Sequence, residues 1–144
     1  MRVEPPANAY SRWRRAGVLV SGVEGARAHG VAANGSRPEG LSDTFYKLLH
    51  WGVQQPEGKV SAAYAHIGEV RSAAAQLWDS VDFIIAPTAP QEAFSFEADV
   101  PANQADFTAW AAFARLPATA VYSGLSEAGL PLSGPVIGPA GHGR

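Results

Sequence analysis

The pattern of apolar residues changes abruptly in the middle of the chain, and this change constrains the fold more than any other feature. From Ser61 to Val81, apolar residues recur at steps of three and four, which predicts an amphipathic helix; they are Tyr64, Ile67, Val70, Ala74, Leu77 and Trp78. The next segment, Phe83 to Ala86, is continuously apolar and is bounded by Pro87. Such a short run is typical of a strand buried on both faces, which favours parallel neighbours. The sequence therefore predicts an α/β fold.

Helix and strand signals continue toward the C-terminus. Asp106 to Ala114 has an amphipathic helical pattern, and its expected buried face consists of Phe107, Trp110, Ala111 and Ala114. Ala118 to Tyr122 and Leu132 to Ile137 are strand-like runs joined by a turn, which predicts a hairpin. We therefore expect a partial mixed sheet flanked by helices. The expected core residues are Trp78, Phe83, Ile84, Ile85, Trp110, Leu116, Val121 and Ile137.

The first forty residues carry the weakest signals of regular structure. Glycines interrupt residues 1–40 repeatedly, and we expect one short strand there, at Val18 to Val23. A helix is expected from Leu41 to Trp51, because Ser42 can cap it and Asp43 suits its first turn. The chain is thus expected to comprise a poorly defined N-terminal segment, residues 1–40, and a partial domain, residues 41–144.

Composition narrows the classes of partner. The 144 residues carry a net charge of −2 and no long basic block, so a nucleic-acid partner is not expected. The sequence has no cysteine, which excludes disulfides and thiolate metal sites. No apolar run approaches the ~20 residues that span a bilayer, so no membrane partner is expected. These features favour a cytoplasmic protein.

Three motifs follow one another in the C-terminal half. Asp82 to Pro90 has the spacing Asp-x-x-x-x-Pro-x-x-Pro. Phe107-Thr108 lies in a helix that leads into Leu116-Pro117-Ala118, and Gly129 to Pro139 reads Gly-Leu-Pro-Leu-Ser-Gly-Pro-Val-Ile-Gly-Pro. This order resembles the C-terminal third of the amidase signature enzymes, serine hydrolases that cleave carboxamide C–N bonds other than peptide bonds. The resemblance covers Arg37 to Pro139 and makes residues 41–144 a partial amidase-like domain.

The resemblance also implies where a substrate would lie. In the family, the exit of the strand at residues 83–86 and the helix at residues 106–114 border the substrate cleft. The candidate residues for the wall of a substrate pocket are therefore Pro87, Thr88, Phe107 and Trp110. A purely structural role, in which the prolines determine the path of the strand exit, is the alternative. No cofactor and no metal ion is expected.

The catalytic residues of the family have no counterpart that we can identify. The resemblance implies a nucleophilic serine, a second serine in a cis peptide, a buried lysine and a Gly/Ser-rich oxyanion loop, yet no two serines are adjacent here. Lys47 is expected on the exposed side of a helix and Lys59 in a loop. Ser126 misses the Gly-x-Ser-x-Gly spacing by one residue and suits a turn. We therefore assign no catalytic residue.

Histidines and departures from the family pattern give no further site. Histidine residues are scattered without the spacing of metal ligands, and His66 is expected to be solvated; the four are His29, His50, His66 and His142. Three positions depart from the family pattern. Ala112 replaces an asparagine, Arg115 replaces a glycine, and Pro135 replaces a glutamine and removes a strand N–H. These changes weaken the transfer of a pocket from the family.

Two functional hypotheses from different classes follow. The chain is either the C-terminal portion of an amidase, inactive alone, or a non-catalytic binding module built on an amidase remnant. In the first case its partner is the missing N-terminal amidase portion. Self-association of the isolated chain is expected, because apolar strands without neighbours favour pairing between edges; a well-protected monomer would instead favour the binding module.

Overall fold

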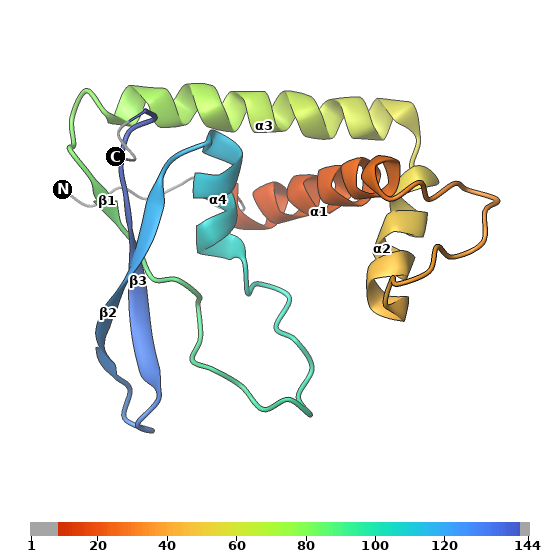
Figure 1. Ribbon diagram of the computed structural model, residues 1–144. Coiled ribbons are helices and arrows are strands. Elements are labelled where there is room, and N and C mark those ends of the chain that lie inside the picture. The colour runs from red at the N-terminus through yellow and green to blue at the C-terminus, as the bar shows by residue number, and fades with distance from the viewer. Residues whose placement is uncertain (1–8, 142–144) are drawn as a thin grey trace. The chain divides into compact units, whose positions relative to one another are not determined.

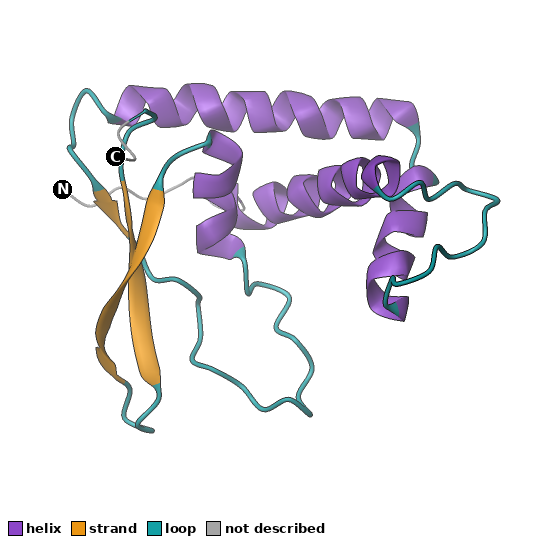
Figure 2. Cartoon of the chain, in the orientation of Figure 1, coloured by secondary structure: helices purple, strands orange, loops and turns teal. Residues whose placement is uncertain are grey.

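The computed structural model describes residues 9–141 (Figures 1 and 2). The helices are α1 (Ala9–Ala28), α2 (Asp43–Val53), α3 (Glu57–Leu77) and α4 (Asp106–Ala114). The strands are β1 (Ile84–Ile85), β2 (Ala118–Leu125) and β3 (Pro131–Ile137). The chain divides into two compact units: Arg15–Ile67 forms one, and the other joins the start of α1 to the chain from Gly68 onward. His142 lies outside the described residues.

The three strands form one sheet in the order β1-β3-β2, and both strand pairs are antiparallel. The predicted hairpin is confirmed, with Ala118 opposite Ile137 and an irregularity in register between Tyr122 and Gly124. The expected class of fold, helices beside a partial sheet, is also confirmed. The parallel neighbours expected for residues 83–86 are wrong, because β1 pairs antiparallel with β3, Ile84 opposite Ile137.

A proline in the central strand explains why β1 is so short. The N–H of Ala86 donates to the carbonyl oxygen of Pro135 at 3.3 Å. The N and O of one residue in a strand face the same neighbour, so the nitrogen of Pro135 also faces β1, where it has no hydrogen to donate. Pairing resumes at Thr88, whose N–H donates to the oxygen of Ser133 at 3.2 Å.

Strand β1 lies at the edge of the sheet and is not buried on both faces, as the sequence pattern had suggested. Phe83 and Ile85 are exposed and Ile84 is half-buried. Of the eight expected core residues, Ile137 alone is fully buried, at 1% exposure. Val121 is exposed, and the remaining three, Trp78, Trp110 and Leu116, are half-buried. The expected core is therefore wrong for Phe83, Ile85 and Val121, because only β3 of this sheet has buried residues.

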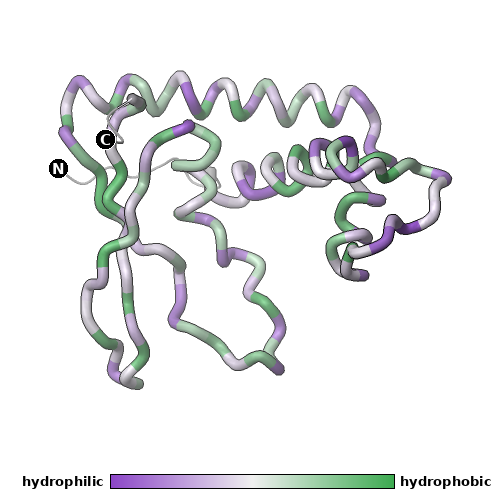
Figure 3. The backbone as a smooth tube through the Cα atoms, viewed as in Figure 1, coloured by the Kyte–Doolittle hydropathy of each residue, from purple (hydrophilic) through white to green (hydrophobic). Residues whose placement is uncertain are grey.

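The buried residues of this unit lie mainly between helices. Apolar positions recur along α3 (Figure 3), which begins directly after Pro56, four residues earlier than expected. Its Val70 and Ala74 form a buried cluster with Ala114 of α4. The half-buried side chains that pack against this cluster are Trp13, Trp110, Phe113 and Leu116. The predicted bounds of α4 agree with the structure.

The other unit contains most of α1, and here one expectation fails completely. Residues 18–23, predicted as a strand, are helical. The buried positions follow a helical repeat of three and four residues along α1: Ala16, Leu19, Val20, Val23 and Ala26. Ala26 packs with Val31 and with Leu49 of α2, and this tertiary packing outweighs the glycines that weaken the helix signal. The division of the chain at residue 40 stays a prediction.

Helix α2 begins as the sequence predicts. The hydroxyl of Ser42 accepts a hydrogen bond from the N–H of Phe45 at 3.3 Å, so the predicted N-cap is confirmed. Leu49 is fully buried, whereas Phe45 is exposed. The ring of Phe45 lies edge-to-face with that of His29, with ring centroids 5.4 Å apart. Within residues 9–141, no helix is both long enough and apolar enough to cross a membrane.

Candidate substrate-cleft wall

The first two candidate residues lie where the chain leaves β1. The hydroxyl of Thr88 donates to the carbonyl oxygen of Ser133 at 2.9 Å and lies 2.9 Å from the Ser133 hydroxyl. Together with its backbone hydrogen bond, Thr88 extends the pairing with β3 beyond the end of β1. Pro87, one residue earlier, is exposed. Thr88 therefore has a structural role, because its hydroxyl is hydrogen-bonded to Ser133 of β3.

The other two candidates lie on α4 and face helices. The ring of Phe107 contacts that of Tyr10 edge-to-face, with centroids 5.2 Å apart. Trp110 packs against the buried cluster of α3 and α4, and both side chains are half-buried. For the part of the chain that the structure describes, no hydrogen bond or ring contact joins Phe107 or Trp110 to Pro87 or Thr88. Two of the candidates, Pro87 and Thr88, thus lie at the exit of β1, and the other two lie on α4.

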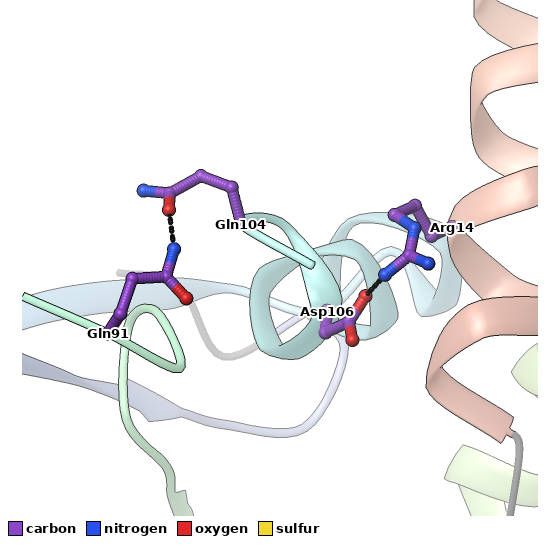
Figure 4. Close-up of polar contacts among 4 residues, drawn as sticks. All are labelled: Arg14, Gln91, Gln104 and Asp106. Atoms are coloured by element: carbon purple, nitrogen blue, oxygen red, sulfur yellow. Dashed lines mark hydrogen bonds and ion pairs between the residues drawn. The ribbon is translucent and has the colours of Figure 1, made fainter. Parts of the chain in front are cut away.

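A long loop connects β1 to α4 (Figure 2). Side-chain hydrogen bonds join residues near its two ends and connect it to the hairpin turn. The amide of Gln91 donates to the amide oxygen of Gln104, near the two ends of the loop (Figure 4). The Ser126 hydroxyl, in the hairpin turn, donates to a carboxylate oxygen of Glu92 at 2.9 Å. Sequence analysis missed these contacts, because amide and hydroxyl side chains carry no signal of their distant partners.

Two charged features occur in and beside this loop: a carboxyl group with a lowered pKa and an ion pair. A hydrogen bond from the Ser95 hydroxyl, followed by a backbone hydrogen bond, lowers the pKa of Glu97 below its ordinary value. At the start of α4, the carboxylate of Asp106 pairs with the guanidinium of Arg14 (Figure 4). Asp106 also suits the first turn of a helix, where the dipole favours a negative charge. The ion pair thus connects the starts of α1 and α4.

The lysines and two of the histidines considered in the sequence lie outside this segment of the chain. Lys47 is exposed on α2. Lys59 lies in the first turn of α3, not in a loop as expected, and its ammonium donates to the side-chain oxygen of Gln55 at 3.1 Å. His50 contacts the carbonyl oxygen of Ala33 at 3.0 Å. His66 is half-buried, which corrects the expectation of a solvated side chain.

The positions that depart from the family pattern have a clear local structure. Arg115 ends α4 in the left-handed conformation, with φ of 57°. Glycine adopts this conformation without steric strain, which explains the glycine that the resemblance implies there. Ala112 is exposed on α4. Within residues 9–141, no group of three or more histidine, aspartate or glutamate side chains could hold a metal ion.

Comparison with known proteins agrees with this fold. The sequence model of the Amidase family matches residues 22–144, so the chain belongs to the amidase family. No curated protein matches the sequence. Among solved structures, a vestigial protein complex described as revealing the origins of an s-triazine catabolic enzyme is similar over 94% of this chain, with a TM-score of 0.80 and 20% identity.

Two further structures extend the comparison. A crystal structure of an amidase is similar over 93% of this chain, with a TM-score of 0.80 and 21% identity. A bacterial aryl acylamidase of the amidase signature family is similar over 90%, with a TM-score of 0.61 and 19% identity. The chain covers 32%, 33% and 30% of these three structures, respectively. It therefore spans about a third of their length.

Proposed function

We propose that this chain forms the C-terminal portion of a carboxamide hydrolase whose nucleophile, second serine and lysine lie on a part of the amidase fold outside these 144 residues. The observation that carries the proposal is the family match over residues 22–144, combined with the coverage of only 32% of a similar structure. On this proposal, Pro87, Thr88, Phe107 and Trp110 contribute to one wall of the substrate cleft.

On this proposal the chain is inactive by itself, and the positions of its lysines support that expectation. A base activates a hydroxyl nucleophile only within hydrogen-bonding distance of it. Lys59 donates to an amide oxygen, and Lys47 is exposed on the surface of α2. The sequence also lacks the adjacent serines of the family loop. Without the catalytic residues, about 10⁶-fold of rate is typically lost.

The test is an amidase assay of the purified 144-residue chain on a panel of aryl and alkyl amides, after circular dichroism has shown that it is folded. No turnover above the buffer rate is expected. The diagnostic variants are Lys47→Ala and Ser36→Ala; Ser36 follows Gly35 and is one of the serines beside a glycine in this sequence. Turnover by the wild-type chain that either variant abolishes would overturn the proposal, because it would place the catalytic site within these residues.

The exposed strand β2 favours a second candidate, a non-catalytic interaction module. Co-expression with a related amidase that lacks its matching third separates the two. Restored turnover of an amide favours the amidase portion. Binding without turnover, together with binding to unrelated strand-presenting proteins, favours the interaction module.

A further inference from the structure

Among residues 9–141, no strand pairs with the edge of β2 that faces away from β3. Hydrogen bonds from Ala86 to Pro135 and from Thr88 to Ser133 show that odd-numbered residues of β3 face β1. Even-numbered residues of β3 therefore face β2, as the hydrogen bond from Gly138 to Pro117 also shows. Through the register of the hairpin, the backbone groups that face away from the sheet belong to Ala118, Ala120 and Tyr122.

From Ala118 to Tyr122, before the irregularity in register that follows Tyr122, this edge carries no proline and no charged side chain to protect it against strand pairing. All residues from Ala118 to Ser123 are exposed, and β2 has no proline and no charged residue. Proteins commonly protect a sheet edge with short strands, prolines or charged side chains. The opposite edge is protected, because β1 has two residues and Pro87 follows it closely. The unpaired backbone groups of β2 are therefore available to an extended strand.

We propose that β2 pairs antiparallel with β2 of a second copy of this chain, about a two-fold axis at Ala120. This register places Ala118 of each copy opposite Tyr122 of the other, so that all three outward-facing residues are paired. Each such pair exchanges two hydrogen bonds, which gives about six bonds across the seam. A six-stranded sheet results, with an isologous interface.

In this register, the side chains of β2 in one copy are complementary to those of β2 in the other. A large Tyr122 lies opposite a small Ala118, and the two Ala120 side chains meet at the axis without crowding. Between them, the β-branched Thr119 lies opposite Val121, a favourable cross-strand combination. No like charges meet, because the strand carries none.

Charges flanking β2 are complementary as well. Arg115 precedes the strand and Glu127 follows it, and both are exposed. Antiparallel pairing brings Arg115 of one copy to the same end of the seam as Glu127 of the other. This relation occurs twice about the axis and favours a second copy of this chain over an unrelated uncharged strand.

Sedimentation equilibrium of the full chain at about 1 to 100 μM tests the proposal. The wild type is expected to be a dimer. A120K and A120E each place two like charges at the axis, and each should raise the Kd about tenfold or more. An equimolar mixture of A120K and A120E should recover the dimer, because opposite charges then meet. Ile85→Lys places a lysine on the protected edge and should leave the dimer unchanged.

Each other outcome overturns the proposal. A monomeric wild type shows that the edge is not a self-association site. A dimer that persists in both A120K and A120E places the interface elsewhere. Failure of the mixture to associate, with both variants folded by circular dichroism, rules out pairing at Ala120. Open-ended assembly of the wild type rules out a closed two-fold interface.

Discussion

Gly22 of α1 and Gly52 of α2 bring the backbones of the two helices into contact. An ideal Cβ atom on Gly52 would lie 2.7 Å from the carbonyl oxygen of Gly22, closer than real Cβ contacts. A Cβ atom on Gly22 would lie 3.1 Å from the carbonyl oxygen of Leu48. Leu49, which is fully buried beside Ala26, lies against Gly25 of α1, where a Cβ atom would come within 2.6 Å of the Leu49 Cδ2 atom.

Gly52→Ala should therefore destabilise the chain, although alanine favours helices. The added methyl group meets rigid backbone, so we expect a loss of about 1–3 kcal/mol in the free energy of unfolding. Gly68→Ala, in α3 with open space around the site, is the matched control and should gain up to about 1 kcal/mol. Chemical denaturation measures both. Equal effects of the two substitutions would show that the helices do not cross this closely.

Arg115→Gly should stabilise the end of α4. The left-handed conformation of Arg115 strains a residue with a Cβ atom, and glycine removes that strain, so we expect a gain of about 0.5–1 kcal/mol. Ala112→Gly, in the interior of the same helix, should instead cost about 1 kcal/mol. Both are measured in the A120K background, so that association does not contribute. A loss of stability in Arg115→Gly would contradict the assigned cap.

The ion pair of Arg14 with Asp106 should contribute more than that of Arg12 with Glu69. The side chains of the first pair are 23% and 15% exposed, and those of the second are 63% and 65% exposed, with atoms 3.7 Å apart. Arg14→Met should cost about 1–3 kcal/mol, because it leaves a partly buried carboxylate without its partner. Arg12→Met should cost less than about 1 kcal/mol. Thermal unfolding of the two variants measures both losses. Equal losses would refute the larger contribution of the pair of Arg14 with Asp106.

Ile137→Ala should be costly, whereas Ile85→Ala should be nearly neutral. Ile137 is 1% exposed in the central strand, and its truncation is expected to cost about 2–5 kcal/mol. Ile85 is 75% exposed, so its truncation should change stability by less than about 0.5 kcal/mol. A large loss in Ile85→Ala would show that another polypeptide covers this strand.

The hydroxyl of Tyr64 should make stability depend on pH in alkaline solution. Burial, followed by its 2.9 Å hydrogen bond to the carboxylate of Glu24, raises the pKa of Tyr64 above 10.0. The folded state thus favours the neutral phenol, so this contribution is complete below pH 10.0 and is lost as the pH rises through the raised pKa.

The corresponding measurement is urea denaturation at a series of alkaline pH values. The difference in the free energy of unfolding between wild type and Tyr64→Phe should shrink above pH 10.0. Glu24→Gln should weaken this pH dependence, since it removes the negative charge beside the hydroxyl. A difference that does not vary with pH would contradict the contact.

Sequence reasoning succeeded where the signal was local. The bounds of α4, the Ser42 cap of α2 and the hairpin of β2 and β3 follow from short patterns of apolar, capping and turn residues. The order of three motifs likewise led to the amidase family, which the family match shows. Each helix, cap, strand and turn signal, and each motif taken singly, consists of residues within a few positions of one another, and for that reason one sequence could reveal them.

Tertiary structure decided what depends on residues far apart in the chain. Residues 18–23 are helical, and the packing of this helix involves a contact of Gly22 with Gly52, residues that lie far apart in the sequence. The apolar run at residues 83–86 reads as a buried strand, yet its burial requires neighbours on both sides, and the structure supplies only β3. Helical periodicity and caps are properties of a segment. Burial and strand pairing are properties of its neighbours, and these are determined only when the whole chain packs.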